Sequence, residues 1–253
     1  NAHIRWELPA LCIKMAYDRL KKNNNRLSLN FYILYAVSAI SAIRVESATS
    51  IILLAVFAIF VVLEQSQFFH YLVKKINVPP IASLMVLVAG TIIVVGGTIA
   101  SNQIFALKYI LQFFNKSSTL TGRANIWISA LASINRRLFL GYGYETSDMI
   151  SMNLVGTTGW GSSAHNLLLE LLYTGGIVLV VIVVFVYVLI QRNFRIGSFT
   201  KTSKVVGVWL LLISIMGLVE PQYEEYLRIA WLVSFYLPLF EQRLLIEHSK
   251  EME

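Results

Sequence analysis

Charged residues and cysteine are scarce in this chain of 253 residues. Asp, Glu, Lys and Arg make up 14% of it and hydrophobic residues 57%, and the mean hydropathy is +0.66. Soluble domains use about 25% charged residues, so this composition excludes an ordinary soluble domain and indicates a membrane protein. The single Cys12 excludes an internal disulfide and gives no cysteine cluster for a metal.

Other features are missing as well. The sequence shows no internal repeat, no low-complexity tract and no cleavable signal peptide. Its net charge of +7 comes from bases scattered over loops without a stacking motif, which argues against nucleic acid as a partner. Because the first residue is Asn1 rather than Met, we expect the chain to be the later part of a longer polypeptide.

The apolar residues form runs of membrane-spanning length, which is roughly 20 residues for about 30 Å of hydrocarbon. Four full or nearly full runs and two shorter ones lie at about 28–43, 48–63, 79–100, 165–190, 204–219 and 227–240. Residues 1–20 carry interrupting charges and are either the remnant of a span or a helix lying at the interface. The runs lack the alternation of barrel strands, and a helix bonds all its backbone groups internally. We therefore predict an all-α, polytopic transmembrane bundle of about six or seven helices, with residues 1–253 as a single integral-membrane domain.

The bases of the short loops fall on one side of this topology. Eleven lie on that side, in the loops 21–27, 64–78 and 191–204 and in the tail, and Arg44 alone lies on the other. The side rich in Lys and Arg is predicted to be cytoplasmic. Residues 101–164 are then an extracytoplasmic loop.

This long loop, residues 101–164, holds most of the polar groups that suggest chemistry. Apolar residues at three- and four-residue spacing predict an amphipathic helix over about 122–135, capped by Thr119 or Thr121. Its apolar face is Ile126, Trp127, Ala130, Leu131 and Ile134. The loop also holds Arg136-Arg137 and the turn Gly141-Tyr142-Gly143, whose glycines allow close approach to a ligand.

The loop ends at Ser163-Ala164-His165-Asn166, directly before an apolar run. At the first turn of a membrane helix, His165 would feel the positive helix end, which favours the neutral imidazole that a general base requires. Glu145, Asp148 and Glu170 are alternative bases, since carboxylates also act as general bases. Tyr142, Tyr144 and Trp160 offer flat aromatic surfaces for the rings of a ligand.

Taken in order, these motifs resemble a known family. Their order resembles the motifs of the O-antigen ligase/polymerase superfamily. The motifs that carry the resemblance are Gly122-Arg123 with Trp127, then Gly141-Tyr142-Gly143, then Ala164-His165-Asn166 with Glu170 and Gly175 or Gly176. The resemblance covers roughly 120–185. It departs at Ser47-Ala48-Thr49, where the family often carries arginine in the middle; Arg44, one helical turn earlier, is the candidate to replace it.

The resemblance implies a multi-pass enzyme of the bacterial inner membrane that acts on undecaprenyl-diphosphate-linked oligosaccharides. Some members polymerise repeat units into O-antigen, capsule or exopolysaccharide, and others ligate the finished glycan to lipid A-core. It implies a metal-independent, inverting glycosyl transfer without a cofactor. The expected partners are the lipid-linked glycan, the lipid bilayer and other polysaccharide assembly proteins.

The resemblance and the residue types together assign the site. His165 and Arg123 are the expected catalytic residues. Guanidinium groups suit a diphosphate, because they stay charged and bind its oxygens through paired hydrogen bonds. The expected substrate-binding residues are Arg44, Arg136, Arg137, Tyr142, Glu145, Asn166 and Glu170. Arg136 and Arg137 also fit interfacial anchors that reach lipid phosphates.

Two other functions are compatible with a basic polytopic chain. A transporter or flippase of lipid-linked oligosaccharide would show internal repeats and ionisable groups at mid-membrane. A non-enzymatic scaffold would leave the order of Arg123, Trp127 and His165 unexplained. The enzyme is therefore the preferred interpretation, with polymerase ahead of ligase because ligases are restricted to cells with an outer membrane.

Overall fold

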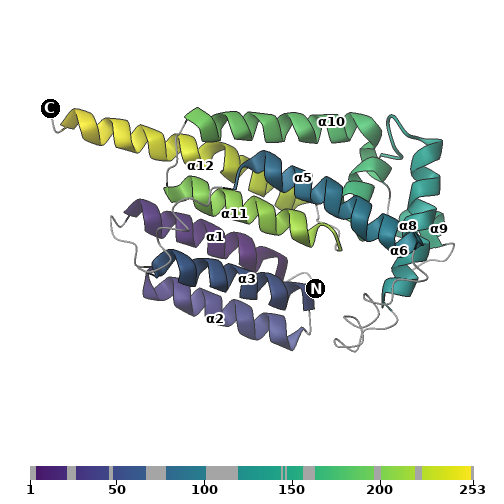
Figure 1. Cartoon of the computed structure of the whole chain (residues 1–253), viewed down its shortest axis with the longest axis horizontal. Coiled ribbons are helices and arrows are strands. Elements are labelled where there is room, and N and C mark those ends of the chain that lie inside the picture. Colours follow the sequence, from purple (N-terminus) through teal and green to yellow (C-terminus); the bar gives the residue numbers. More distant parts are fainter. Residues whose placement is uncertain are drawn as a thin grey trace. The chain divides into compact units, whose positions relative to one another are not determined.

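A computed structural model describes ten stretches of the chain. They are residues 4–21, 27–45, 48–66, 78–100, 119–143, 145, 147–155, 163–196, 201–219 and 224–251. Regular structure in these stretches is helical throughout (Figure 1). The helices are α1 (Ile4–Lys21), α2 (Leu29–Arg44), α3 (Ala48–Gln65), α5 (Pro80–Thr91), the π-helical η1 (Ile92–Gly96), α6 (Gly97–Ala100), α8 (Thr119–Arg136), α9 (Ser147–Val155), α10 (Leu167–Ile196), α11 (Lys201–Met216) and α12 (Glu224–Glu251).

The predicted apolar runs coincide with helices. Among the described residues, two helical stretches are able to cross a membrane by length and composition, Pro80–Ile99 and Leu167–Phe194, with mean hydropathies of 2.2 and 2.7. Leu29–Arg44, Ser50–Gln65 and Thr202–Met216 are shorter apolar helices. The all-α prediction therefore holds for the described residues. The number of crossings and the orientation remain predictions.

The long loop of the sequence analysis contains two described helices, α8 and α9, which lie against each other. Helix α8 begins at Thr119, three residues before the predicted start. Of its predicted apolar face, Trp127, Ala130 and Ile134 are buried, whereas Leu131 is exposed. The stretches 101–118 and 156–162 lie outside the described residues, as do Tyr144 and Trp160.

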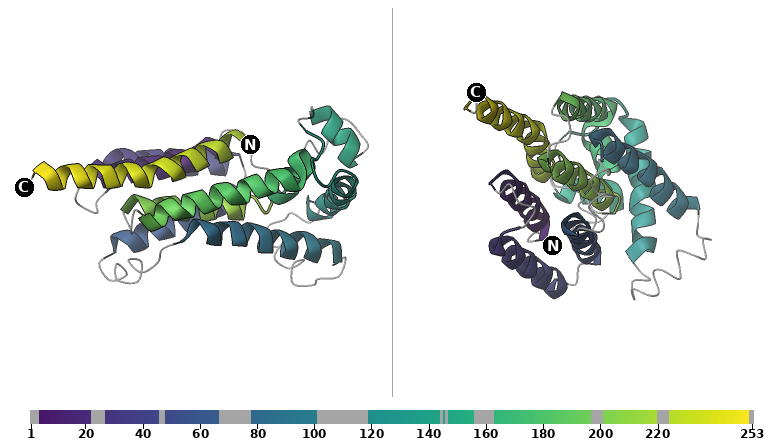
Figure 2. Two further views of the ribbon diagram at one scale, coloured as in Figure 1. Left: turned by 90° about the horizontal axis from the view of Figure 1, so that it is seen from above. Right: turned by 60° about the vertical axis from the view of Figure 1, so that its left-hand side comes forward.

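The chain divides into two compact units. The first comprises residues 1–83, 187–213 and 223–253, and the second comprises 84–186 and 214–222. In the first unit α1 packs on α2 and on α12, and α2 packs on α3 (Figures 1 and 2). Phe31 and Phe57 are buried there, with ring centroids 6.4 Å apart.

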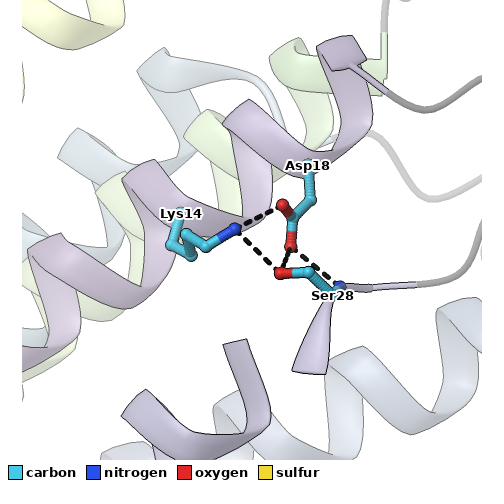
Figure 3. Close-up of polar contacts among 3 residues, drawn as sticks. All are labelled: Lys14, Asp18 and Ser28. Atoms are coloured by element: carbon cyan, nitrogen blue, oxygen red, sulfur yellow. Dashed lines mark hydrogen bonds and ion pairs between the residues drawn. The ribbon is translucent and has the colours of Figure 1, made fainter. Parts of the chain in front are cut away.

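A polar cluster joins α1 to the start of α2 in the first unit (Figure 3). The carboxylate of Asp18 accepts hydrogen bonds from the backbone N–H of Ser28, at 3.0 Å, and from its hydroxyl, at 2.6 Å. Lys14 pairs with the other carboxylate oxygen and donates to the Ser28 hydroxyl at 2.8 Å. Burial of Asp18 raises its pKa, but these hydrogen bonds and the charge of Lys14 together lower that pKa below its ordinary value. The cluster ties the C-terminal half of α1 to the residue before α2.

A similar contact holds α11. Glu241 of α12 is buried, and its carboxylate accepts hydrogen bonds from the backbone N–H and the hydroxyl of Thr202. An acidic group is favourable at a helix N-terminus, where the first N–H groups lack helical partners. Both clusters therefore satisfy helix starts inside an apolar unit.

The second unit has its own core around α8. The buried residues are Val95, Trp127, Ala130, Ile134, Ile150, Leu154, Ala164, Leu169 and Tyr173. They come from η1, α8, α9, the segment before α10 and the first turns of α10. This core carries the segment with the histidine predicted to be catalytic.

Candidate functional site

Helix α8 is attached to the segment before α10 through Trp127. The indole Nε1 of Trp127 donates a hydrogen bond to the carbonyl oxygen of Ala164 at 2.9 Å, and both residues are buried. One turn earlier on α8, Nη1 of Arg123 donates to the carbonyl oxygen of Val219 at 2.8 Å. Side chains at i and i+4 share one face of a helix. The same face of α8 therefore holds the chain next to His165 and the turn that follows α11.

Asn166 connects three parts of the second unit. Its side chain is fully buried. Its Nδ2 donates to the carbonyl oxygen of Leu218 at 3.0 Å and to the hydroxyl of Thr91 at 3.2 Å. Its Oδ1 accepts from the backbone N–H of Leu169 at 3.1 Å, which makes it the N-cap of α10. The backbone N–H of Leu167 also donates to the carbonyl oxygen of Gly217 at 2.7 Å.

His165 directly precedes this cap. Helix α10 begins at Leu167 rather than at 165, because Asn166 takes the capping position. His165 has a φ of 48°, the only positive value among the described residues other than glycine. Residues in this left-handed region cost roughly 1–3 kcal/mol and persist where the surroundings hold them. Here Ala164 is held by Trp127 on one side and Asn166 by Leu218 on the other.

Glu170 closes the same segment from α10. Its Oε2 accepts a hydrogen bond from the backbone N–H of Ala164 at 2.6 Å. The carboxylate thus reaches back from the first turns of the helix to the chain before it. Both backbone polar groups of Ala164 are bonded to side chains, one from α8 and one from α10.

Gly176, one of the two glycines named with the family resemblance, lies where α10 is broken. Gly176 has φ 62° and ψ −159°, which are not helical values. A break leaves backbone carbonyls without helical partners, and these are costly when buried. The carbonyl oxygens of Tyr173 and Thr174 accept from the backbone N–H groups of Tyr142 and Gly143, both at 2.8 Å.

The first backbone N–H groups after the break in α10 also find partners in the segment 138–143. The backbone N–H of Ile177 donates to the carbonyl oxygen of Leu138 at 2.9 Å, and that of Val178 to Phe139 at 3.2 Å. Residues 138–143 therefore supply partners to both sides of the break in α10.

Two glycines permit this close approach. A Cβ at Gly141 would lie 2.6 Å from backbone atoms of Tyr173 and Thr174, and one at Gly176 would lie 2.3 Å from the carbonyl oxygen of Phe139. Both also have positive φ. The sequence analysis left Gly141 as a turn or a ligand contact; its neighbour here is the backbone of α10.

An aromatic and polar cluster surrounds this junction. The rings of Tyr142 and Tyr173 stack with centroids 4.8 Å apart, and the guanidinium carbon of Arg137 lies 4.7 Å from the Tyr142 centroid. The Tyr173 hydroxyl donates to Glu145 at 2.7 Å. Asn153 of α9 donates to the same carboxylate at 3.1 Å.

The expected site residues thus fall into separate places. Arg123, His165, Asn166 and Glu170 meet around the segment 163–166 and the turn 217–219, and Arg137, Tyr142 and Glu145 meet around Tyr173. Arg136 ends α8 and is exposed. Arg44 ends α2 in the first unit and is exposed. The side chain of Asp148 lies outside what the structure describes.

Sequence reasoning missed three parts of this arrangement. Thr91, Tyr173 and the turn 217–219 belong to it, yet each lies in or beside an apolar run and carries no motif. Gly217 after the run of α11 signals a helix end, but not what the turn contacts. In the described part of the chain, no group of three or more His, Cys, Asp or Glu gathers to hold a metal ion.

Comparison with known proteins gives one match. No curated protein and no solved structure matches the chain. A family model described as O-Antigen ligase matches residues 32–184, which is more than half of the chain and includes α8, the His165 segment and the break in α10. The chain therefore belongs to the O-antigen ligase family of membrane enzymes.

Proposed function

We propose that this protein is a glycosyltransferase that polymerises undecaprenyl-diphosphate-linked repeat units into a surface polysaccharide on the non-cytoplasmic face of the membrane. The observation that carries the proposal is the arrangement of Arg123 and His165 around one turn. Arg123 binds the carbonyl of Val219, and the residues beside His165 bind Gly217 and Leu218. A cationic group and a candidate base are thus fixed to the same three-residue turn.

In this proposal Arg123 holds the diphosphate. A guanidinium has five N–H donors in a planar fork, so it can bind a backbone carbonyl and phosphate oxygens together. The bond to Val219 orients the fork. Negative charge grows on the diphosphate as the glycosidic bond breaks, and an oriented cation stabilises that charge without reorganising.

His165 is proposed as the general base. The hydroxyl oxygen of the acceptor sugar forms a bond to the anomeric carbon of the donor while the bond from that carbon to the diphosphate oxygen breaks. The hydroxyl proton passes to the imidazole, the bonding pair leaves with undecaprenyl diphosphate, and the configuration inverts. The strained backbone of His165 and its place next to the positive end of α10 support this role.

The carboxylates are proposed to position rather than to react. Glu170 is bonded to the backbone of Ala164, and Glu145 to Tyr173 and Asn153. Each carboxylate accepts hydrogen bonds from the protein, and taking a proton from the substrate would disturb those bonds. Asn166, with its buried side chain, is likewise proposed to hold His165 in place.

The first test uses single substitutions. His165→Ala and Arg123→Ala are expected to abolish polymer while the protein remains in the membrane at its normal level. Arg123→Lys keeps the positive charge but loses the planar guanidinium fork, so this variant is expected to make little polymer. Asn125→Ala, at an exposed position of the same helix, is the matched control and is expected to make normal polymer. Polymer of normal length and amount with Ala at position 123 or 165 would contradict the assignment.

Ligation is the second candidate, because the matching family is described as O-Antigen ligase. The lipid-linked glycans of a deletion strain distinguish the two. Single repeat units attached to lipid A indicate a lost polymerase, whereas full-length chains held on undecaprenyl diphosphate indicate a lost ligase. Glycan accumulating on the cytoplasmic face would instead indicate a flippase and exclude both.

A further inference from the structure

The turn between α8 and Gly141 presents three consecutive exposed apolar residues. Leu138, Phe139 and Leu140 are 38%, 69% and 74% exposed. Directly before them stand Arg136 and Arg137, which are also exposed. Exposed apolar residues that are contiguous and bordered by charge mark interaction surfaces. The partner can be argued from where this turn lies along α10.

The length of α10 places its break relative to the bilayer. The uncharged run of this helix extends from Leu171 to Gln191, between Glu170 and Arg192. The run is of membrane-spanning length, which is roughly 20 residues for about 30 Å of hydrocarbon. Gly176 lies five residues inside the end marked by Glu170, which corresponds to about 8 Å. In an α10 that spans the bilayer, the break would then lie within the hydrocarbon and close to one surface.

The exposed turn shares that depth, because it is bonded to the break. The carbonyl oxygens of Leu138 and Phe139 accept from the N–H groups of Ile177 and Val178, the first residues after Gly176. The same helix exposes Val178, Val181 and Phe185 farther along the span. The apolar turn thus continues an exposed apolar surface of a helix able to cross the membrane.

The backbone of the turn is compatible with such a position. Irregular backbone reaches membrane depth only when its polar groups are bonded within the protein. The carbonyl of Arg137 accepts from the N–H of Gly141 at 2.9 Å, and those of Leu138 and Phe139 are bonded to α10. Three successive carbonyls of the turn are therefore satisfied without water.

We propose that Leu138-Phe139-Leu140 inserts into the acyl chains of the leaflet near the Glu170 end of α10, with Arg136 and Arg137 binding lipid phosphates above it. Long arginine side chains reach from the hydrocarbon boundary to the headgroups. Phe139 and Leu140 bury apolar surface in lipid that would otherwise face water. The insertion would fix the height of α8, and with it Arg123, relative to lipid-linked substrates.

Site-directed spin labelling measures this directly. The protein is prepared with Cys12 replaced by alanine, then labelled at Phe139→Cys or, separately, Leu140→Cys. It is reconstituted into vesicles of phosphatidylethanolamine with phosphatidylglycerol. Collision rates with oxygen, which concentrates in lipid, and with a water-soluble nickel chelate report the depth of each label. Asn125→Cys on α8 and Val181→Cys in the span provide the reference positions.

Labels at 139 and 140 are expected to favour oxygen over nickel several-fold more than the label at 125, and less than the label at 181. Labels at both positions as accessible to nickel as the label at 125 would overturn the proposal. The depth measurement needs no substrate, so it can fail while the proposed glycosyl transfer stands, and the reverse also holds. Because two labelled positions are used, a poorly folded variant at one of them does not remove the test.

Discussion

The indole nitrogen of Trp127 donates a hydrogen bond to the carbonyl oxygen of Ala164 at 2.9 Å, and neither residue reaches solvent. The two residues are 37 positions apart in the chain. This contact ties the amphipathic helix of the long loop to the residue directly before His165. It explains physically why a tryptophan lies one helical turn after Arg123.

Trp127→Phe should separate this hydrogen bond from the packing of the ring. The substitution leaves the buried Ala164 carbonyl without its donor, which costs roughly 1–3 kcal/mol. Where this free-energy cost displaces His165 from its reactive position, the rate of polymer formation should fall about tenfold, because each 1.36 kcal/mol corresponds to a factor of ten in rate. The measurement is polymer yield at matched protein level in membranes. Ile128→Ala, at an exposed position of α8, is the control. Unchanged yield with Phe at position 127 would show that the contact does not act on the site.

Asn166→Ala should lower the stability of the protein as well as its activity. Asn166 is fully buried and bonds Leu218, Thr91 and the N-terminus of α10, so its loss leaves several groups without partners. Removing an N-cap alone costs roughly 0.5–2 kcal/mol. The apparent melting temperature in detergent should fall by several degrees. An Asn166→Ala protein that melts like the wild type but makes no polymer would support direct substrate binding instead.

The glycines at the α10 junction should differ sharply from Gly97 at the start of α6. Gly141→Ala and Gly176→Ala place a Cβ against backbone atoms and force a residue with a side chain into positive φ, which by itself costs roughly 1–2 kcal/mol. Gly143→Ala has the positive φ but open space, so a smaller loss is expected. Gly97→Ala has helical backbone and open space and should be neutral or stabilising. Apparent melting temperatures of the four proteins test this order, and equal values for Gly141→Ala and Gly97→Ala would contradict it.

Asp18→Asn should remove a pH-dependent part of the stability of the first unit. The pKa of Asp18 is lowered in the folded protein. Its contribution is therefore present above the pKa of the unfolded chain, about 3.9, and is lost as the pH falls through the lower folded value. Hydrogen bonds to charged groups contribute roughly 1.5–3 kcal/mol, so the wild type should melt several degrees above the variant at pH 7. The gap should close as the pH falls below about 4. A gap that stays the same at low pH would mean that the charge of Asp18 does not stabilise the fold.

The sequence predicted most of the helices, because hydropathy and periodicity are local properties. Helix α5 begins at Pro80, where the missing N–H of proline falls among the donors that a first turn leaves free. The apolar face of α8 was correct at Trp127, Ala130 and Ile134, since side chains three and four apart share a face. The assignment of Leu131 to that face was wrong, because its side chain is exposed rather than packed in the core.

The sequence by itself predicted a helical membrane enzyme with most of its polar motifs between residues 101 and 166. Only the tertiary structure decided what those motifs contact. Arg123 meets Val219 across 96 positions of sequence, Asn166 meets Thr91 across 75, and Gly141 allows the close approach of residues 138–143 to a broken helix. No local pattern encodes such pairs, because they depend on how helices far apart in the chain pack together. The physical reason is that buried backbone groups must find partners, and folding alone determines which partners are within reach.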